Sequence, residues 1–294
     1  MTYCVAMRLN AGLVFLGDSR TNAGVDQIST FRKMTVFEHP GERLMVLMSA
    51  GNLAITQAVR QIVCERTGPN DRSVWNAKTM FDAVRIVGDA VREIHERDAH
   101  ALSQAGIEFN CNFLFGGQIR GEQMRLFQVY AAGNFIEAIP ENPYFQIGEA
   151  KYGKPIIDRV LSPSTPLDEA AKCALISMDS TLRSNISVGL PLDLLVYEEG
   201  RLAVTKFVQI DHDNQYMRMI RNTWGTRLKQ VFQEIPDPSW RDAPLDADTP
   251  KLETDPTFPV RAPLPASLQT SAARGVPQVQ LVADGGSGSS GVPR

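Results

Sequence analysis

The second residue of the chain, Thr2, could act as the nucleophile of a hydrolase without a histidine as base. Thr2 follows Met1 directly and opens a short apolar run, Tyr3 to Met7. Removal of Met1 would leave a free α-amine on the residue that carries the hydroxyl, so a nucleophile and its base would share one residue. An unperturbed α-amine titrates at about pH 7.7–8.0, close to working pH. We therefore interpret Thr2 as the candidate nucleophile.

An aspartate and a lysine are the charged residues that could support Thr2. Lys33 is the only lysine in the first 77 residues, which hold seven arginines. The use of lysine at this position therefore favours a functional role for it. The pKa of an ammonium group moves on burial, whereas a guanidinium stays protonated. Asp18 ends the second apolar run and would keep Lys33 charged and oriented. Alternatively, Lys33 is an ordinary surface lysine and Asp18 is a turn residue at the end of a strand.

The first hairpin brings Thr2 and Asp18 together despite their separation in the chain. A three-residue loop over 10–12 places Asp18 opposite Cys4. Thr2 then lies two positions further along the same face, as a diagonal neighbour of Asp18. Lys33, placed between them, would help to deprotonate the hydroxyl and keep the α-amine neutral.

Small residues mark a junction between a strand and a helix at Ser49-Ala50-Gly51-Asn52. The first N–H groups of a helix have no partner within the helix. Glycine lets a substrate carbonyl approach the backbone closely, so the Gly51 N–H is a candidate donor to an oxyanion. The same residues also fit a tight turn in which Asn52 caps the helix.

Alternation and periodicity predict runs of strands and runs of helices. Strands are expected over 4–9, 13–17, 34–38, 43–49, 109–116, 124–130, near 135, and over 144–147, 192–197 and 202–208. Helices are expected over 53–63, 80–94, 152–160, 167–182 and 214–234. This order favours an α+β fold with antiparallel sheets and helices outside them. Near-continuous apolar strands, such as 44–48, indicate sheets covered on both faces.

Composition excludes several classes of partner. The net charge of −3 and the short, mixed charge runs argue against nucleic acid. No apolar stretch reaches about 18 residues, so no membrane span is expected. Arg8, Asn10 and Asp18 interrupt any signal-peptide core. The four scattered cysteines fit reduced thiols, and we expect a cytoplasmic protein.

The end of the chain differs from the rest. Residues 241–294 hold 8 of the 18 prolines and a single aromatic residue, Phe258. Such a segment cannot bury enough apolar surface to fold alone. We expect a folded domain over 1–240 and a disordered tail over 241–294.

These residues together resemble a proteasome β-type subunit, a member of the N-terminal nucleophile hydrolases. Three further segments resemble the bacterial ancestral β-subunit branch called Anbu: Arg20 to Gly24, Gly148 to Pro155 and Ser177 to Gly189. The resemblance covers about residues 2–235. It implies a four-layer αββα sandwich that self-associates into a homo-oligomeric ring or spiral.

The resemblance also implies roles for individual residues. It makes Thr2 the nucleophile, Asp18 and Lys33 the acid–lysine pair, and the Gly51 N–H the oxyanion donor. It implies substrate binding by Ser49 and by a residue of the Arg20 to Gly24 segment. No metal or organic cofactor is required.

The sequence departs from the family pattern in four ways. The interval from Asp18 to Lys33 is one residue shorter than usual. Asn22 stands where a substrate-binding threonine is usual, although its backbone could still pair with a peptide. Glu149 occupies a stretch where the family usually has serine and glycine. The residues that support the N-terminus correspond loosely to three positions near the end of a predicted helix: Ser184, Asn185 and Ser187.

The resulting hypothesis is a threonine-dependent hydrolase that acts on peptide or protein substrates. A narrow-specificity amidase or acyl transferase with the same site is one alternative. A catalytically silent ring that serves as a scaffold is another.

Overall fold

The computed structural model describes residues 2–23, 27–67 and 72–237. Met1–Phe232 form one compact unit. The expected tail, 241–294, lies outside the described residues, so the boundary at 240 stays a prediction. Within the described part of the chain, no helix combines the length and apolar character needed to cross a membrane.

Two antiparallel five-stranded sheets form the centre of the compact unit. The strands of the first sheet, in spatial order, are β10 (Tyr144–Gly148), β1 (Tyr3–Leu9), β2 (Gly12–Asp18), β11 (Leu192–Glu198) and β12 (Lys206–Ile210). Those of the second are β5 (Met34–His39), β6 (Arg43–Gly51), β7 (Cys111–Ile119), β8 (Arg125–Val129) and β9 (Phe135–Glu137). A separate hairpin joins β3 (Arg20–Ala23) to β4 (Gln27–Thr30).

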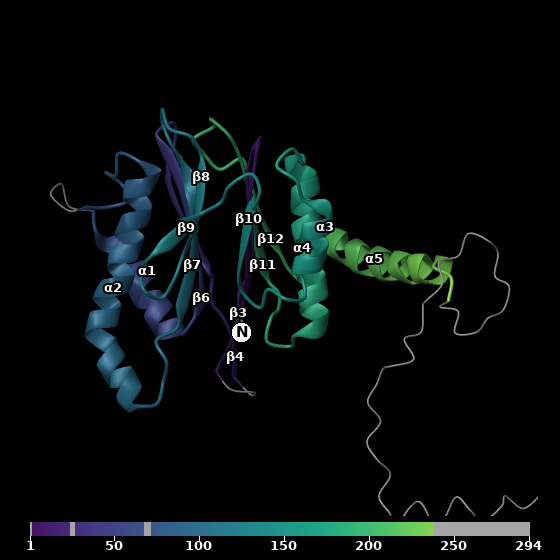
Figure 1. Ribbon diagram of the computed structural model, residues 1–294, viewed down its shortest axis with the longest axis horizontal. Helices are drawn as coiled ribbons and strands as arrows, with labels where there is room; N and C mark the ends of the chain where they lie inside the picture. The colour runs from purple at the N-terminus through teal and green to yellow at the C-terminus, as the bar shows by residue number, and fades with distance from the viewer. Residues whose placement is uncertain (1, 24–26, 68–71, 238–294) are drawn as a thin grey trace, which may run out of the picture. The chain divides into compact units, whose positions relative to one another are not determined.

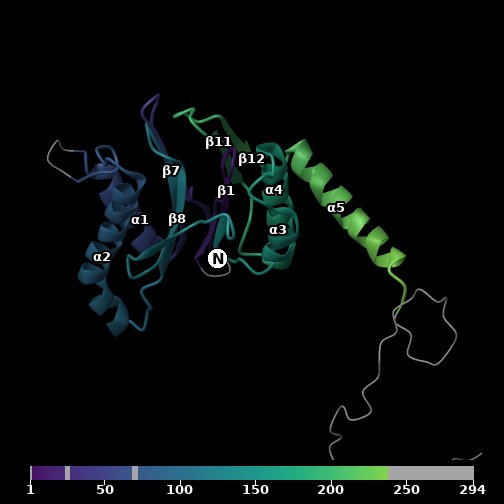
Figure 2. The ribbon, with the colours of Figure 1, turned by 45° about the horizontal axis from the view of Figure 1, so that its top comes forward.

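Helices cover the outer face of each sheet. Helices α1 (Leu53–Glu65) and α2 (Met80–Gln104) pack on the second sheet, and α3 (Lys154–Val160) and α4 (Leu167–Ser184) lie on the side of the first (Figures 1 and 2). A further helix, α5 (Gln215–Glu234), follows β12. The arrangement confirms the expected α+β fold, a four-layer αββα sandwich.

Burial on both faces explains the continuous apolar strands. Every residue of β2 is buried, and Phe15 and Leu13 contribute to the layer between the sheets together with Leu44 and Val46 of β6. The outer layer beside α2 is separate and is formed by an apolar stripe that repeats every three or four residues, including Val84, Val87 and Val91.

The register of the first hairpin differs by one residue from the prediction. Leu9 pairs with Gly12, so only residues 10–11 form the loop, and Cys4 lies opposite Gly17 rather than Asp18. Gly12 belongs to the ladder and pairs with β11 as well as with β1. Only glycine fits at this position, because a Cβ on residue 12 would lie 1.9 Å from the Tyr197 carbonyl oxygen. The shift places Asp18 beside the start of β1.

Two other elements differ from the sequence prediction. The β3–β4 hairpin was not expected because its strands are short and polar. Strand β12 begins at Lys206 instead of Leu202, since Leu202 has a φ of 49° and cannot continue a strand. Helix α2 continues to Gln104 instead of ending at 94. The remaining strands and helices confirm the predicted elements to within a few residues.

A buried polar cluster fixes the strand that follows Thr2. The Tyr3 hydroxyl lies 2.5 Å from Ser177 Oγ on α4 and accepts a hydrogen bond of 2.6 Å from Gln146 Nε2 on β10. A Cβ at Gly153 would lie 2.1 Å from Ser177 Oγ, so glycine is required beside this cluster. The start of β1 is therefore held to α4 and β10.

Candidate active site

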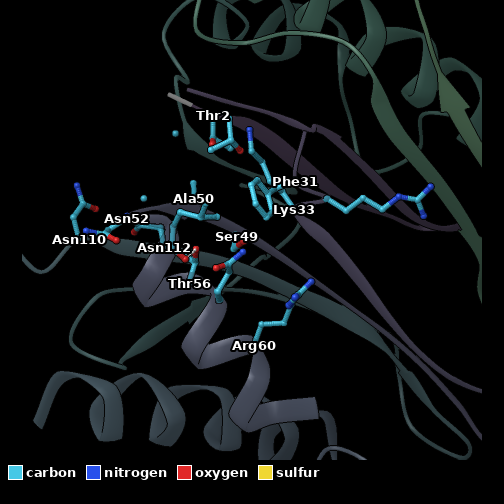
Figure 3. Close-up of a pocket in the computed structure, with 16 residues that line it drawn as sticks. Thr2, Phe31, Lys33, Ser49, Ala50, Asn52, Thr56, Arg60, Asn110 and Asn112 are labelled. Carbon is cyan, nitrogen blue, oxygen red and sulfur yellow. Dashed lines mark hydrogen bonds between the residues drawn. The ribbon is translucent and has the colours of Figure 1, made fainter. Parts of the chain in front are cut away.

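A cavity of about 700 Å³ opens beside Thr2 (Figure 3). Its walls come from the segment before β5, the end of β6, the first turns of α1 and the start of β7. The lining residues are Thr2, Thr21, Phe31, Arg32, Lys33, Ser49, Ala50, Gly51, Asn52, Leu53, Thr56, Gln57, Arg60, Asn110, Asn112 and Gly148. The structure thus brings four of the predicted site residues, Thr2, Lys33, Ser49 and Gly51, to one cavity.

The backbone around Thr2 is held on both sides. The Thr2 carbonyl oxygen accepts a hydrogen bond of 2.7 Å from the Glu149 N–H, and the Tyr3 N–H donates to Asp18 Oδ1 at 3.0 Å. Gly148 has a φ of 81°, and a Cβ there would lie 2.0 Å from the Thr2 carbonyl oxygen. Only glycine therefore allows β10 to approach Thr2 so closely.

Asp18 and Lys33 form a buried ion pair behind Thr2. Lys33 Nζ lies 2.7 Å from Asp18 Oδ1 and also donates to the Arg20 carbonyl oxygen at 2.6 Å. The second carboxylate oxygen, Oδ2, accepts a hydrogen bond of 3.4 Å from the Gly189 N–H. A buried ion pair is tolerated when further hydrogen bonds satisfy both partners, as they do here.

Burial raises the pKa of Asp18 above its usual range, and the Lys33 ammonium and the Tyr3 N–H oppose this rise. Asp18 therefore depends on Lys33 to remain ionised. In return, the carboxylate fixes the position of the ammonium group at the wall of the cavity.

The Gly51 N–H faces the cavity rather than the neighbouring strand β7. Asn52 N donates to the Asn110 carbonyl oxygen at 2.9 Å, so alternation along the antiparallel ladder turns the preceding N–H away from β7. The Ser49 N–H, two residues earlier on the same edge, donates to the Lys33 carbonyl oxygen at 3.1 Å. The Gly51 N–H therefore points to the side on which Lys33 lies.

Asn52 also begins α1 as the cap that the sequence suggested. Its Oδ1 accepts a hydrogen bond of 3.0 Å from the Ala54 N–H. Gly51 has a φ of 119°, and a Cβ there would lie 2.5 Å from the Asn110 carbonyl oxygen. The cap and an exposed Gly51 N–H thus coexist, and the two interpretations of this junction are compatible.

The predicted substrate-binding positions lie on two different segments. Ser49 lines the cavity from β6, whereas Asn22 pairs with Ile28 in the β3–β4 hairpin. The sequence analysis missed Thr21, which also lines the cavity. Its buried Oγ1 has no hydrogen-bond partner among the described residues. Nothing in its sequence context distinguishes it from an ordinary strand residue.

The loop after α4 connects Glu149 to Asp18. Asn185 Nδ2 donates to Glu149 Oε2 at 2.9 Å, and Asn185 Oδ1 accepts from the Ser187 N–H at 2.9 Å. Ser184, the last residue of α4, is exposed. The same loop ends at Gly189, whose N–H donates to Asp18. Glu149 was not among the predicted site residues, although its departure from the family pattern was the signal.

A cysteine near Thr2 is buried in the layer between the sheets. Cys4 is fully buried, and burial raises the pKa of its thiol. Because the thiolate is the reactive form, Cys4 behaves as a small core residue.

Comparison with solved structures relates the chain to proteasome-like subunits. It is 53% identical to Anbu (ancestral beta-subunit) from Yersinia bercovieri, over 81% of this chain and 100% of that one, with a TM-score of 0.77. Identity to Anbu from Hyphomicrobium sp. strain MC1 is 50%, over 80% and 98% of the two chains, with a TM-score of 0.74. Identity to the Pseudomonas aeruginosa Anbu complex, which forms a helical assembly, is 46%, over 81% and 98%, with a TM-score of 0.77. No family model and no curated protein matches the chain.

Removal of Lys33 tests whether the ion pair is integral to the fold. Lys33→Ala leaves the Asp18 carboxylate buried without its cation, and we expect a loss of about 3–5 kcal/mol in the free energy of unfolding, measured by urea denaturation. The double variant Asp18→Asn/Lys33→Met should lose much less, because no unpaired charge remains. Lys206→Ala is the control, since its pair with Asp168 is exposed and should contribute little to stability. Equal stability of Lys33→Ala and the control would contradict this interpretation.

Proposed function

We propose that this chain, which belongs to the Anbu family of ancestral proteasome β-subunits, is a threonine-dependent hydrolase of peptides or peptide-like amides. The observation that supports this most is the placement of Thr2 at the wall of a cavity shared with Lys33 and Gly51. These residues bring a hydroxyl, an ammonium group and a backbone N–H to the walls of one cavity. This is the set that attack on an amide requires.

The proposed reaction uses both functional groups of Thr2. After Met1 is removed, Oγ attacks the substrate carbonyl carbon while the α-amine accepts the hydroxyl proton. The Gly51 N–H donates to the oxyanion, and the protonated α-amine returns its proton to the departing amine. Water then attacks the acyl-enzyme ester with the α-amine as base, which releases the acid and restores Thr2.

In this scheme Lys33 acts through its charge. A fixed cation beside Thr2 stabilises the alkoxide and so lowers the pKa of the hydroxyl. The same cation repels the protonated α-amine and so favours its neutral form. Asp18 keeps that charge in place, since it lies 2.7 Å from Lys33 Nζ.

We further assign the support of the N-terminus to Glu149 and Asn185. Their side chains are joined by a hydrogen bond, and the Glu149 N–H holds the Thr2 carbonyl oxygen. Ser187 contributes its N–H to Asn185, whereas the exposed Ser184 is the least supported member of this group. A carboxylate in this place would stabilise the protonated α-amine between catalytic steps.

The substrate would lie between two segments. An extended peptide would run between Asn22 on β3 and Ser49 on β6, the two predicted substrate-binding positions. Self-association into a ring or spiral follows by analogy with the helical assembly of the Pseudomonas aeruginosa relative. We propose that the protein works in the cytoplasm.

Covalent labelling tests the proposed function directly. A peptide vinyl sulfone should add once to Thr2 Oγ, and only in molecules whose intact mass lacks Met1. Thr2→Ala should show no adduct, while Thr223→Ala, an exposed threonine on α5, should react like the unaltered protein. Labelling that persists in Thr2→Ala, or a reactive protein that retains Met1, would refute the mechanism. Absence of any adduct would instead favour the silent scaffold.

The pH dependence of labelling tests the role of Glu149. A carboxylate near the α-amine raises its pKa, so Glu149→Gln should lower that pKa and move the acid limb of the rate profile to lower pH. The amide of glutamine keeps an acceptor for the Asn185 contact but removes the charge, so only the electrostatic effect on the α-amine is lost. Glu141→Gln, at an exposed position, is the control and should not move the profile. An unshifted profile in Glu149→Gln would show that the Glu149 carboxylate does not act on the α-amine.

A further inference from the structure

The charge on the walls of the cavity has one sign. Among the lining residues are three cations, Arg32, Lys33 and Arg60, and no carboxylate. Lys33 is paired with Asp18. The Arg32 guanidinium lies 6.0 Å from the Phe207 ring centroid, and its charge opposes the rise in the pKa of Asp193 that burial causes. Neither Arg32 nor Arg60 forms an ion pair within the described part of the chain, and Arg60 is the less exposed of the two.

Arg60 lies on the helical face that borders the cavity. Leu53, Thr56, Gln57 and Arg60 recur at intervals of three and four, so they share one side of α1. Long side chains on a helix lean toward its N-terminus, which here is the end next to Gly51. Arg60 is half-buried, and Figure 3 shows it beyond Thr56, on the side of the cavity opposite Thr2.

The other polar groups of the cavity are neutral. The Thr56 hydroxyl donates to the Leu53 carbonyl oxygen at 3.1 Å and is therefore occupied. The amides of Gln57 and Asn112 and the hydroxyl of Ser49 remain as hydrogen-bond donors on the walls. These groups are suited to a carboxylate that enters between them.

Other classes of side chain fit this cavity less well. A lysine or arginine of the substrate would meet Arg60 as a like charge. A large apolar side chain would displace water from the Arg60 guanidinium and leave the charge without a partner, which is unfavourable. A carboxylate instead forms a charge-assisted, bidentate pair with the guanidinium.

We propose that Arg60 makes the enzyme selective for an acidic residue, aspartate or glutamate, immediately before the bond that is cleaved. The proposal rests on the proposed function, because Thr2 and the Gly51 N–H fix where the reacting carbonyl lies. The side chain attached next to that carbonyl then extends into the cavity toward α1. The substrate class is therefore a peptide or peptide-like amide whose acyl residue carries a carboxylate.

A panel of four vinyl sulfone peptides that differ only in the last residue tests this selectivity. We expect the glutamate peptide to label Thr2 at least about ten-fold faster than its glutamine isostere, since a hydrogen bond to a charged group is worth about 1.5–3 kcal/mol. Leucine and lysine peptides should be slower still. Arg60→Met should reduce the glutamate-to-glutamine ratio to about two or less, and Arg60→Glu should favour lysine.

Each ratio compares two peptides on one protein sample, so partial misfolding of a variant cancels. Arg85→Met, at an exposed position on α2, is the matched control and should keep the preference for glutamate. If leucine or glutamine peptides label Thr2 as fast as the glutamate peptide, the selectivity is refuted while the hydrolase stands. If the preference survives in Arg60→Met, Arg60 is not its source. If no peptide labels Thr2, both proposals fail.

Discussion

The carboxylate of Asp18 is the group on which the rest of the site depends. It accepts hydrogen bonds from the Lys33 ammonium, the Tyr3 N–H and the Gly189 N–H, which come from three segments far apart in the chain. Tyr3 opens β1 in the first sheet, and Lys33 directly precedes β5 in the second. The carboxylate therefore joins the two sheets at the end where Thr2 lies. Because a buried charge without its partner costs several kcal/mol, folding itself sets the position of the ammonium group.

Backbone geometry completes the site around this ion pair. At Gly148 and Gly51 a side chain would collide with a neighbouring carbonyl oxygen. Glycine at these positions allows β10 to approach Thr2 closely and allows the end of β6 to approach the start of β7 closely. The first approach fixes the Thr2 carbonyl oxygen, and the second leaves the Gly51 N–H directed away from the ladder. Helix α1 begins directly after this junction and carries Arg60 on the face that borders the cavity. The end of β6 thus supplies the proposed oxyanion donor, and the helix that follows it supplies the proposed specificity residue.

Residue type and local order were enough to predict much of this arrangement. Thr2, Asp18, Lys33 and Gly51 stand at strand ends that can be recognised from apolar runs and small-residue turns, and the layered α+β fold follows from the order of the elements. The hairpin register was wrong by one residue because Gly12 looks like a loop residue, whereas it joins the ladder against β11. Glu149, Thr21 and Arg60 were not selected because their importance comes from packing between segments that are distant in sequence.

The central claim is that one residue, Thr2, supplies both the nucleophile and its base. A peptide epoxyketone tests it most directly, because a hydroxyl and an amine on neighbouring carbons of one residue can together close a six-membered ring with its two electrophilic carbons. If Thr2 supplies both groups, tandem mass spectrometry will find this ring on an N-terminal Thr2, with Met1 absent. An adduct attached through Oγ alone, or through another residue while Met1 remains in place, would contradict it.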